Sequence, residues 1–235
     1  MNRKNWLQKF SHIQKRRVSR YGHYVIFLVN GPQVRKSSLS AEEFTNFAIH
    51  DDFPNLIPKN EIWISNEVSG EERYFAIHDA LYQLKCIQRG MSKSEAYERA
   101  ILNEKSMRQS KLLSRHSPES TNKPAPESVY IKRYCQLGDI SVWIVDGSKI
   151  RDLFKTDFVD GGHGYVYPWI PNDEVWIESG LDDREIKYTL YHEVSERNLM
   201  KNNHMEYHQA HSKASKLEFE CRNKSGCPKP ENCNV

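Results

Sequence analysis

The chain has 235 residues and a formal net charge of +3, and 38% of its residues are hydrophobic. This length accommodates one large domain or two small ones, and the nearly balanced charge favours no class of partner. No run of 18 apolar residues occurs, so we expect no membrane span, and the basic start lacks the apolar core of a secretory signal. Five cysteines, an odd number, do not resemble a disulfide framework, so we expect a cytoplasmic protein with free thiols.

A basic arm, residues 1–23, begins the chain. Between residues 2 and 20 it contains cations but no acid: Arg3, Lys4, Lys9, Lys15, Arg16, Arg17 and Arg20. Trp6, Phe10 and Ile13 fall at helical spacing, which predicts an amphipathic helix whose apolar stripe packs on the body of the protein. The cations at its end either face water or contact nucleic-acid phosphates, where each contact releases counterions. The residues concerned are Lys15, Arg16, Arg17 and Arg20.

A long internal repeat follows the arm. The segment Ile-Pro-Lys-Asn-Glu-Ile-Trp-Ile at 57–64 reappears at 170–177 as Ile-Pro-Asn-Asp-Glu-Val-Trp-Ile. Further matches extend outward from it: His50 with His163 upstream and, at one constant offset downstream, His78 with His192, Ala96 with Ala210, Ala100 with Ala214, and Glu104 with Glu218. Matches in an unbroken register indicate duplicated units. We place these units at 24–108 and 139–222, joined by a polar linker at 109–138 and followed by a cysteine-containing tail at 223–235.

Both units have the same predicted elements. Strand-like runs lie at 24–29, 61–64, 141–145 and 174–177. Capping signals and glycine or asparagine breaks predict helices at 70–89, 92–107, 182–201 and 205–221. The predicted fold class is α+β, a tandem duplication of a small sheet with two antiparallel helices. Trp63 and Trp176 should lie in the cores, while Arg35 and Arg151 either form structural salt bridges or bind an anion.

The second unit carries a candidate metal site. His192 and Glu196 lie four residues apart on one face of the first helix, and His211 and Glu218 share a face of the second. Packing the two helices together would let these side chains converge, and imidazole with carboxylate suits zinc, with iron or manganese as alternatives. Glu193 stands where a base would take a proton from water. His163 and Glu218 are each an additional ligand or a substrate contact. The alternative is a buried hydrogen-bond network between the helices.

The first unit serves as an internal control for that site. At the matching positions it has His78, Asp79, Tyr82, Tyr97 and Glu104, so tyrosines replace Glu196 and His211. One histidine and one distant glutamate would bind a metal poorly, which predicts a metal-free first unit. His50 and His163, His78 and His192, and Glu104 and Glu218 occur as pairs in both units. This retention favours a structural role for these residues. In the tail, Cys221, Cys227 and Cys233 lack the C-x-x-C pairs of structural zinc, so loose thiols are expected.

Three motifs of the second unit carry a resemblance to known families. They are Asp157-Phe-Val-Asp-Gly-Gly-His163, Ile170-Pro-x-x-Glu-Val-Trp-Ile177, and His192-Glu-x-x-Glu-Arg197 with Ala210-His211-x-x-Ala214-x-x-x-Glu218. Over residues 150–218 the chain resembles a group of largely uncharacterised proteins of bacteria, phages and mobile elements. The strand, turn and first helix also look like the minimal zincin core of ImmA/IrrE-type metallopeptidases. That resemblance implies a zinc-binding, peptidase-like scaffold, although Glu196 stands where zincins have their second histidine.

Three functions remain open from the sequence. The first is a metal-dependent, peptidase-like hydrolase with its site in the second unit. The second is a non-enzymatic phage, mobile-element or host-interaction protein that binds a protein or peptide partner. The third is a nucleic-acid-associated protein that uses the basic arm. The sequence names neither the substrate nor the oligomeric state.

Overall fold

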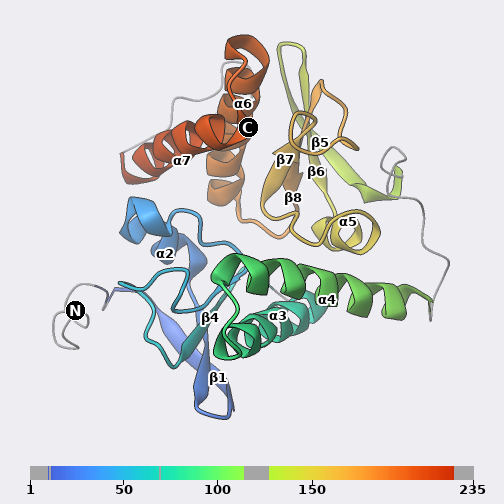
Figure 1. The fold of residues 1–235 in the computed structure, drawn as a ribbon. Coiled ribbons are helices and arrows are strands. Elements are labelled where there is room, and N and C mark those ends of the chain that lie inside the picture. Colours follow the sequence, from blue (N-terminus) through green and yellow to red (C-terminus); the bar gives the residue numbers. More distant parts are fainter. Residues whose placement is uncertain (1–9, 11, 69, 114–126, 225–235) are drawn as a thin grey trace. The chain divides into compact units, whose positions relative to one another are not determined.

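The computed structural model describes residues 10, 12–68, 70–113 and 127–224, and every structural statement below concerns these residues. The chain divides into two compact units, residues 1–114 and 115–235. Each unit combines a four-stranded sheet with helices (Figure 1). The predicted α+β fold, a tandem duplication of a small sheet with helices, is therefore confirmed.

The first unit contains two short helical segments and two long helices around its sheet. In chain order the elements are β1 (Lys15–Tyr21), β2 (Tyr24–Val29), α2 (Gly31–Ser37), a 3₁₀ turn (Leu39–Ala41), β3 (Phe47–Ala48), β4 (Glu61–Ser65), α3 (Gly70–Gln88) and α4 (Lys93–Leu113). The strand order is β1-β2-β4-β3. Strands β2 and β4 are parallel, and the outer pairs are antiparallel.

The second unit repeats the order of strands and α-helices, while its 3₁₀ turn lies before the first strand instead of after the short helix. Its elements are a 3₁₀ turn (Glu127–Val129), β5 (Tyr130–Leu137), β6 (Ile140–Val145), α5 (Gly147–Leu153), β7 (Gly161–His163), β8 (Glu174–Glu178), α6 (Asp183–Asn203) and α7 (Tyr207–Asn223). The strand order β5-β6-β8-β7 and the strand directions match those of the first unit. In both units the two long helices pack against each other, and the first of them packs on the sheet.

The repeated Glu-x-Trp segment forms the central parallel strand of each sheet. Trp63 and Trp176 are fully buried, as predicted. Each indole Nε1 donates a hydrogen bond of 2.7 Å to the glutamate two residues earlier, Glu61 or Glu174. A buried indole needs a partner for its N–H, so the motif preserves the tryptophan together with its acceptor.

Asn30-Gly31 and Asp146-Gly147 begin the short helices α2 and α5, and the carboxylate of an ion pair lies against each glycine. Arg151 donates to both oxygens of Glu178 at 2.7 and 2.8 Å, and Arg35 does the same to Glu67. A Cβ on Gly147 would lie 2.4 Å from the Glu178 carboxyl carbon, so only glycine leaves room for this pair. The structural salt bridge is confirmed for both arginines.

Three expectations need correction. Phe10 and Ile13 are buried against the first core, but residues 15–21 form the edge strand β1 and no amphipathic helix. Strand β5 likewise begins inside the segment assigned to the linker. Cys135 and Cys221 are disulfide-bonded, so the prediction of free thiols is wrong for them, whereas Cys86 is a buried free thiol.

The disulfide-bonded cysteines bear on the cellular compartment of the protein. Disulfides persist mainly in oxidising compartments, so cytoplasmic localisation stays a prediction that these two cysteines do not favour. No helix among the described residues is long and apolar enough to cross a membrane. Trp6, Cys227 and Cys233 lie outside the described residues.

Candidate metal centre

The sheet register shows which residue of the first unit corresponds to His163. In β7, Gly162 pairs with Trp176 and His163 with Val175, whereas in β3 it is Ala48 that pairs with Trp63. The position of His163 is therefore taken by the residue after Ala48, which is the buried Ile49. The predicted match of His50 with His163 is wrong. His50 Nδ1 instead lies 2.6 Å from the backbone oxygen of Ile57.

The long helices give a second correction of the same kind. Arg108 of α4 lies over the ring of Phe75 at 3.9 Å, and Arg222 of α7 lies over the ring of Tyr188 at 4.5 Å. The two rings therefore occupy equivalent places on α3 and α6. Counting along the helix from these rings matches Asp79, and not His78, with His192.

The same count matches Gln83 with Glu196. On the second helices the predicted offset holds: Ala96, Ala100, Ala210 and Ala214 are all fully buried, and Glu104 and Glu218 each contact the arginine four residues on. Tyr97 thus does correspond to His211. Of the candidate ligands of the second unit, only Glu218 is retained at its equivalent position in the first, as Glu104. The candidate histidines are not retained, so a structural role for paired histidines loses its basis.

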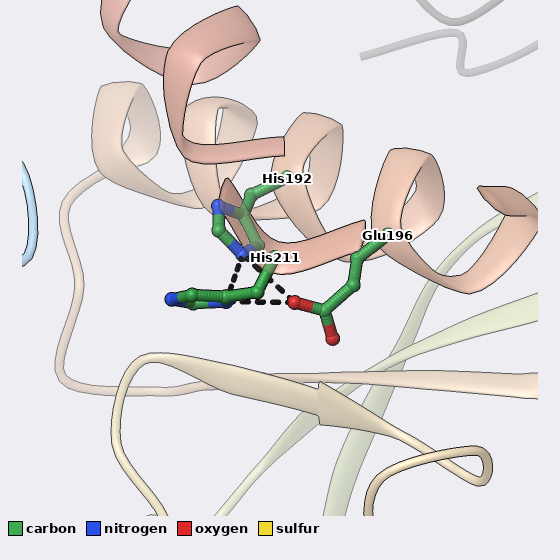
Figure 2. Close-up of side chains that lie close together, drawn as sticks. All are labelled: His192, Glu196 and His211. Carbon is green, nitrogen blue, oxygen red and sulfur yellow. Dashed lines mark hydrogen bonds and ion pairs between the residues drawn. The ribbon is translucent and has the colours of Figure 1, made fainter. Parts of the chain in front are cut away.

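In the second unit, three of the predicted site residues converge (Figure 2). Helix α6 presents His192 and Glu196 one turn apart, and α7 presents His211 to them. His211 Nδ1 lies 2.7 Å from Glu196 Oε2 and 3.2 Å from His192 Nε2, and His192 Nε2 lies 3.5 Å from Glu196 Oε2. The close helix packing needed for this arrangement comes from Ala210 and Ala214, as predicted.

The size of this triangle suits one metal ion. Zinc binds nitrogen and oxygen at about 2.0–2.1 Å, so two ligand atoms of a tetrahedral site lie about 3.3 Å apart. The three observed separations, 2.7, 3.2 and 3.5 Å, bracket that value. Two imidazoles and one carboxylate are also a donor set that zinc uses. The residues present therefore fit a divalent metal ion, while the distances alone do not select which one.

A charged cluster lies behind His192. Its Nδ1 is 3.0 Å from Glu218 Oε2, although the alignment falls short of a hydrogen bond. Arg222 bonds Glu218 and also pairs with Glu185, at 2.5 and 2.6 Å. Metal-binding histidines usually direct their second nitrogen at a carboxylate, which fixes the ring orientation. Glu218 occupies that supporting place and is no ligand of the triangle.

His163 supports Glu196 from the opposite side. The backbone N–H of Tyr165 donates to His163 Nδ1 at 3.3 Å, so the ring hydrogen belongs on Nε2, which lies 3.0 Å from Glu196 Oε1. Glu196 therefore has one oxygen bonded to His163 and the other in the triangle. His163 also belongs to a second group of potential ligand atoms, with Glu193 and Glu196. Its bond to Glu196 makes it a positioning residue for the first group.

The ionisation of the cluster follows from these contacts. Burial favours the neutral form of Glu196, but the three imidazoles around it hold the pKa of its carboxyl well below the usual range. Burial likewise favours neutral His192, yet the nearby carboxylates of Glu196 and Glu218 raise its pKa well above 6.5. The cluster is thus built to stabilise positive charge between its carboxylates.

Glu193 lies beside the triangle and against the edge strand. Its Cγ would be 3.0 Å from a Cβ at Gly161, so glycine is needed there for β7 to approach α6. Burial, with Glu196 and other acids adding to it and His192 opposing, raises the pKa of Glu193 to about 8. In the described part of the chain its carboxylate has no hydrogen-bond donor, and Arg197, four residues further along the helix, donates to the backbone oxygen of Asn172.

The cluster reaches the protein surface at one ligand. The His211 side chain is 32% exposed, against 10% for His192 and 3% for Glu196. The Tyr207 ring lies 5.3 Å from that of His211, and both Tyr207 and Tyr165 are partly exposed. A small molecule would therefore approach from the His211 side.

Sequence reasoning missed the supporting residues Glu185 and Arg222. The sequence contained a signal for Arg222, because the pair Glu104 and Arg108 of the first unit reappears in the second as Glu218 and Arg222, at the offset of the other helix matches. The residues predicted to bind nucleic acid belong to the first unit, on β1, and take no part in this cluster. Comparisons with protein-family models, with curated proteins and with solved structures found no match to this chain. The zincin-like resemblance therefore remains a prediction.

Proposed function

We propose that the second unit is a metal-dependent hydrolase that uses zinc, with a peptide-like substrate. The observation that carries the proposal is the convergence of His192 Nε2, His211 Nδ1 and Glu196 Oε2 within 3.5 Å of one another. Three protein ligands with a more exposed side leave the open position that catalytic zinc sites keep for water or substrate. Iron or manganese would accept the same donors.

The chain's own residues would divide the work as follows. His192, Glu196 and His211 hold the ion, which supplies a lowered pKa for a bound water and polarisation of a carbonyl. Glu193, next to the first ligand, accepts the proton of that water in its ionised form and returns it to the leaving group. His163 and Glu218 keep two of the ligands in place. The peptide-like substrate rests on the His-Glu arrangement, which metallopeptidases share.

The alternative is a hydrogen-bond network without metal. In it, the bond from His211 to Glu196 places a hydrogen on His211 Nδ1. The raised pKa of His192 places another on His192 Nε2, only 3.2 Å from His211 Nδ1. Two N–H groups would then face each other across the triangle. A cation at the centre removes both hydrogens and satisfies all three atoms, which favours the metal.

The test is hydrolysis of a defined peptide mixture by the full chain loaded with zinc, with products read by mass spectrometry. We expect Glu193→Gln to keep its zinc and to lower turnover by about 100-fold or more, the usual contribution of a positioned base. The exposed Glu220→Gln serves as the matched control and should retain full activity. Full activity in Glu193→Gln, or no cleavage by zinc-loaded wild type, would reject the hydrolase while leaving the metal site standing.

A further inference from the structure

The β1–β2 hairpin of the first unit presents cations of one sign on an exposed edge strand. Every residue of β1 after Lys15 is exposed, including Arg16, Arg17 and Arg20. Residues 1–41 contain no aspartate or glutamate at all. In the described residues, Arg16 and Arg17 have no ion pair, and Arg20 uses its Nε to bond Gly22 O. These guanidinium groups therefore keep donors available for an external anion.

A β-bulge arranges two of the arginines along one face. The register shifts between Arg17 and Ser19, so Arg17 pairs with Phe27 and Arg20 with Val25. Their partners lie two residues apart on β2, which places Arg17 and Arg20 on the same face of the sheet. A step of two residues along a strand is about 6.6 Å. A row of guanidinium groups at this spacing suits a chain of anions better than a single one.

Aromatic side chains lie at the tip of the same hairpin. Tyr21, at the end of β1, is 65% exposed, and His23 in the turn is exposed as well. The His23 ring lies 4.0 Å from that of Tyr24. Exposed aromatic faces next to cations are what single-stranded nucleic acids contact, because bases stack on the rings while the phosphates meet the cations.

The corresponding hairpin of the second unit shows that an edge strand of this fold does not need so many arginines to avoid pairing with another sheet. Charged residues on an edge strand prevent sheet-to-sheet association whatever their sign. Strand β5 has only two cations, Lys132 and Arg133, and Arg133 is hydrogen-bonded to Gln136. At the position of Lys15 it has Tyr130, which bonds Glu174 as Lys15 bonds Glu61. The additional arginines of β1 therefore call for another explanation.

We propose that the β1–β2 hairpin binds nucleic acid along its exposed edge, with Arg17 and Arg20 contacting the phosphate backbone from one face of the strand, Arg16 contacting it from the other, and Tyr21 stacking on a base. The proposed contacts are to phosphates and to the face of a base, so we expect binding that is independent of sequence. A membrane fits less well, because an exposed large apolar side chain occurs on β1 only at Val18, apart from the aromatic Tyr21. The hairpin belongs to the first unit, and the proposal does not depend on the metal site.

The test is fluorescence anisotropy of the full chain with labelled single-stranded DNA, single-stranded RNA and duplex DNA of about 20 nucleotides over a salt series. We expect the triple variant Arg16→Ala, Arg17→Ala, Arg20→Ala to weaken binding at least about tenfold at low salt. It should also reduce the slope of log K against log salt by about 2, at about 0.7 per lost contact to a single strand. Tyr21→Ala should weaken binding about fivefold or more without changing that slope, because stacking releases no counterions.

The matched control is Lys132→Ala with Arg133→Ala on the equivalent strand, which should bind as wild type does. All substituted side chains are exposed, and circular dichroism checks that the variants fold. A preference among the three probes identifies the natural form of the ligand and supports the proposal. No binding at low salt, undiminished binding by the triple variant, an equal loss in the control, or binding to anionic lipid vesicles in preference to the oligonucleotides would each overturn it.

Discussion

In both units an arginine of the second long helix joins two glutamates, Arg108 with Glu72 and Glu104, and Arg222 with Glu185 and Glu218. What faces this shared cluster differs. In the first unit it is Asp79, a buried acid whose Oδ1 has no hydrogen-bond partner. In the second unit it is His192, which directs its other nitrogen at Glu196 and His211.

Asp79 and His192 respond differently to the glutamates that lie beside each of them. Burial and the nearby Glu104 raise the pKa of Asp79 to about 8, so the first unit avoids an additional charge by keeping this acid protonated. The second unit instead places imidazoles there and can accept a cation. The comparison separates a supporting cluster common to both copies from a set of ligands present in only one.

Removing the shared arginine should destabilise either unit but affect metal binding in only one. Arg108→Ala and Arg222→Ala each leave two glutamates without their buried partner, which should cost about 3–5 kcal/mol of unfolding free energy. In Arg222→Ala the loosened Glu218 should also weaken zinc affinity about 10- to 100-fold. Urea denaturation and zinc titration by calorimetry measure the two effects. If Arg108→Ala weakens zinc equally, the two clusters are not independent.

Asp79 should make stability fall as the pH rises. Its folded pKa of about 8 lies above the ordinary 3.8, so the folded chain keeps a proton that the unfolded chain releases. Stability present at low pH is therefore lost between about pH 4 and pH 8, by at most about 1.4 kcal/mol per pH unit. Asp79→Asn should flatten the dependence seen in urea denaturation from pH 5 to pH 8. An unchanged slope in the variant would show that Asp79 is ionised in the folded protein.

His163 should matter for zinc through Glu196 alone. We expect His163→Ala to weaken zinc affinity about 10-fold or more, and His163→Gln, which retains a donor, to recover most of that loss. Competition with a chromogenic chelator measures the affinity. The matched variant Ile49→Ala removes core volume at the equivalent place in the first unit and should leave zinc affinity unchanged. Equal losses in His163→Ala and His163→Gln would argue that His163 is itself a ligand.

The sequence predicted the elements well where local patterns determine them. The Pro-x-x-Glu-x-Trp strands and the starts of the capped helices came out within two residues, because alternation and caps are local signals, whereas α4 runs six residues past its predicted end at 107. The meeting of His192, Glu196 and His211 also followed from helical spacing and buried alanines. These features depend on neighbours in the sequence.

Local patterns did not show reliably which residues of the two units correspond to each other. Between the first and second long helices the second unit has one more residue, so matching His78 with His192 required an offset that the first helices do not share. The β1 strand was missed because the helix predicted from Trp6, Phe10 and Ile13, which precede the strand, was extended through residues 15–20. Pairing and register are set by contacts between distant segments, and one chance identity between histidines was enough to mislead.

The most direct test of the metal site is the zinc content of the full chain, saturated with zinc, dialysed, and measured by inductively coupled plasma mass spectrometry. Wild type should retain one zinc per chain. His211→Ala, at the most exposed ligand and hence the least disruptive to folding, should retain none, whereas Tyr97→Ala at the equivalent position of the first unit should still retain one. A wild-type chain without zinc, or a His211→Ala chain that keeps it, would contradict the site.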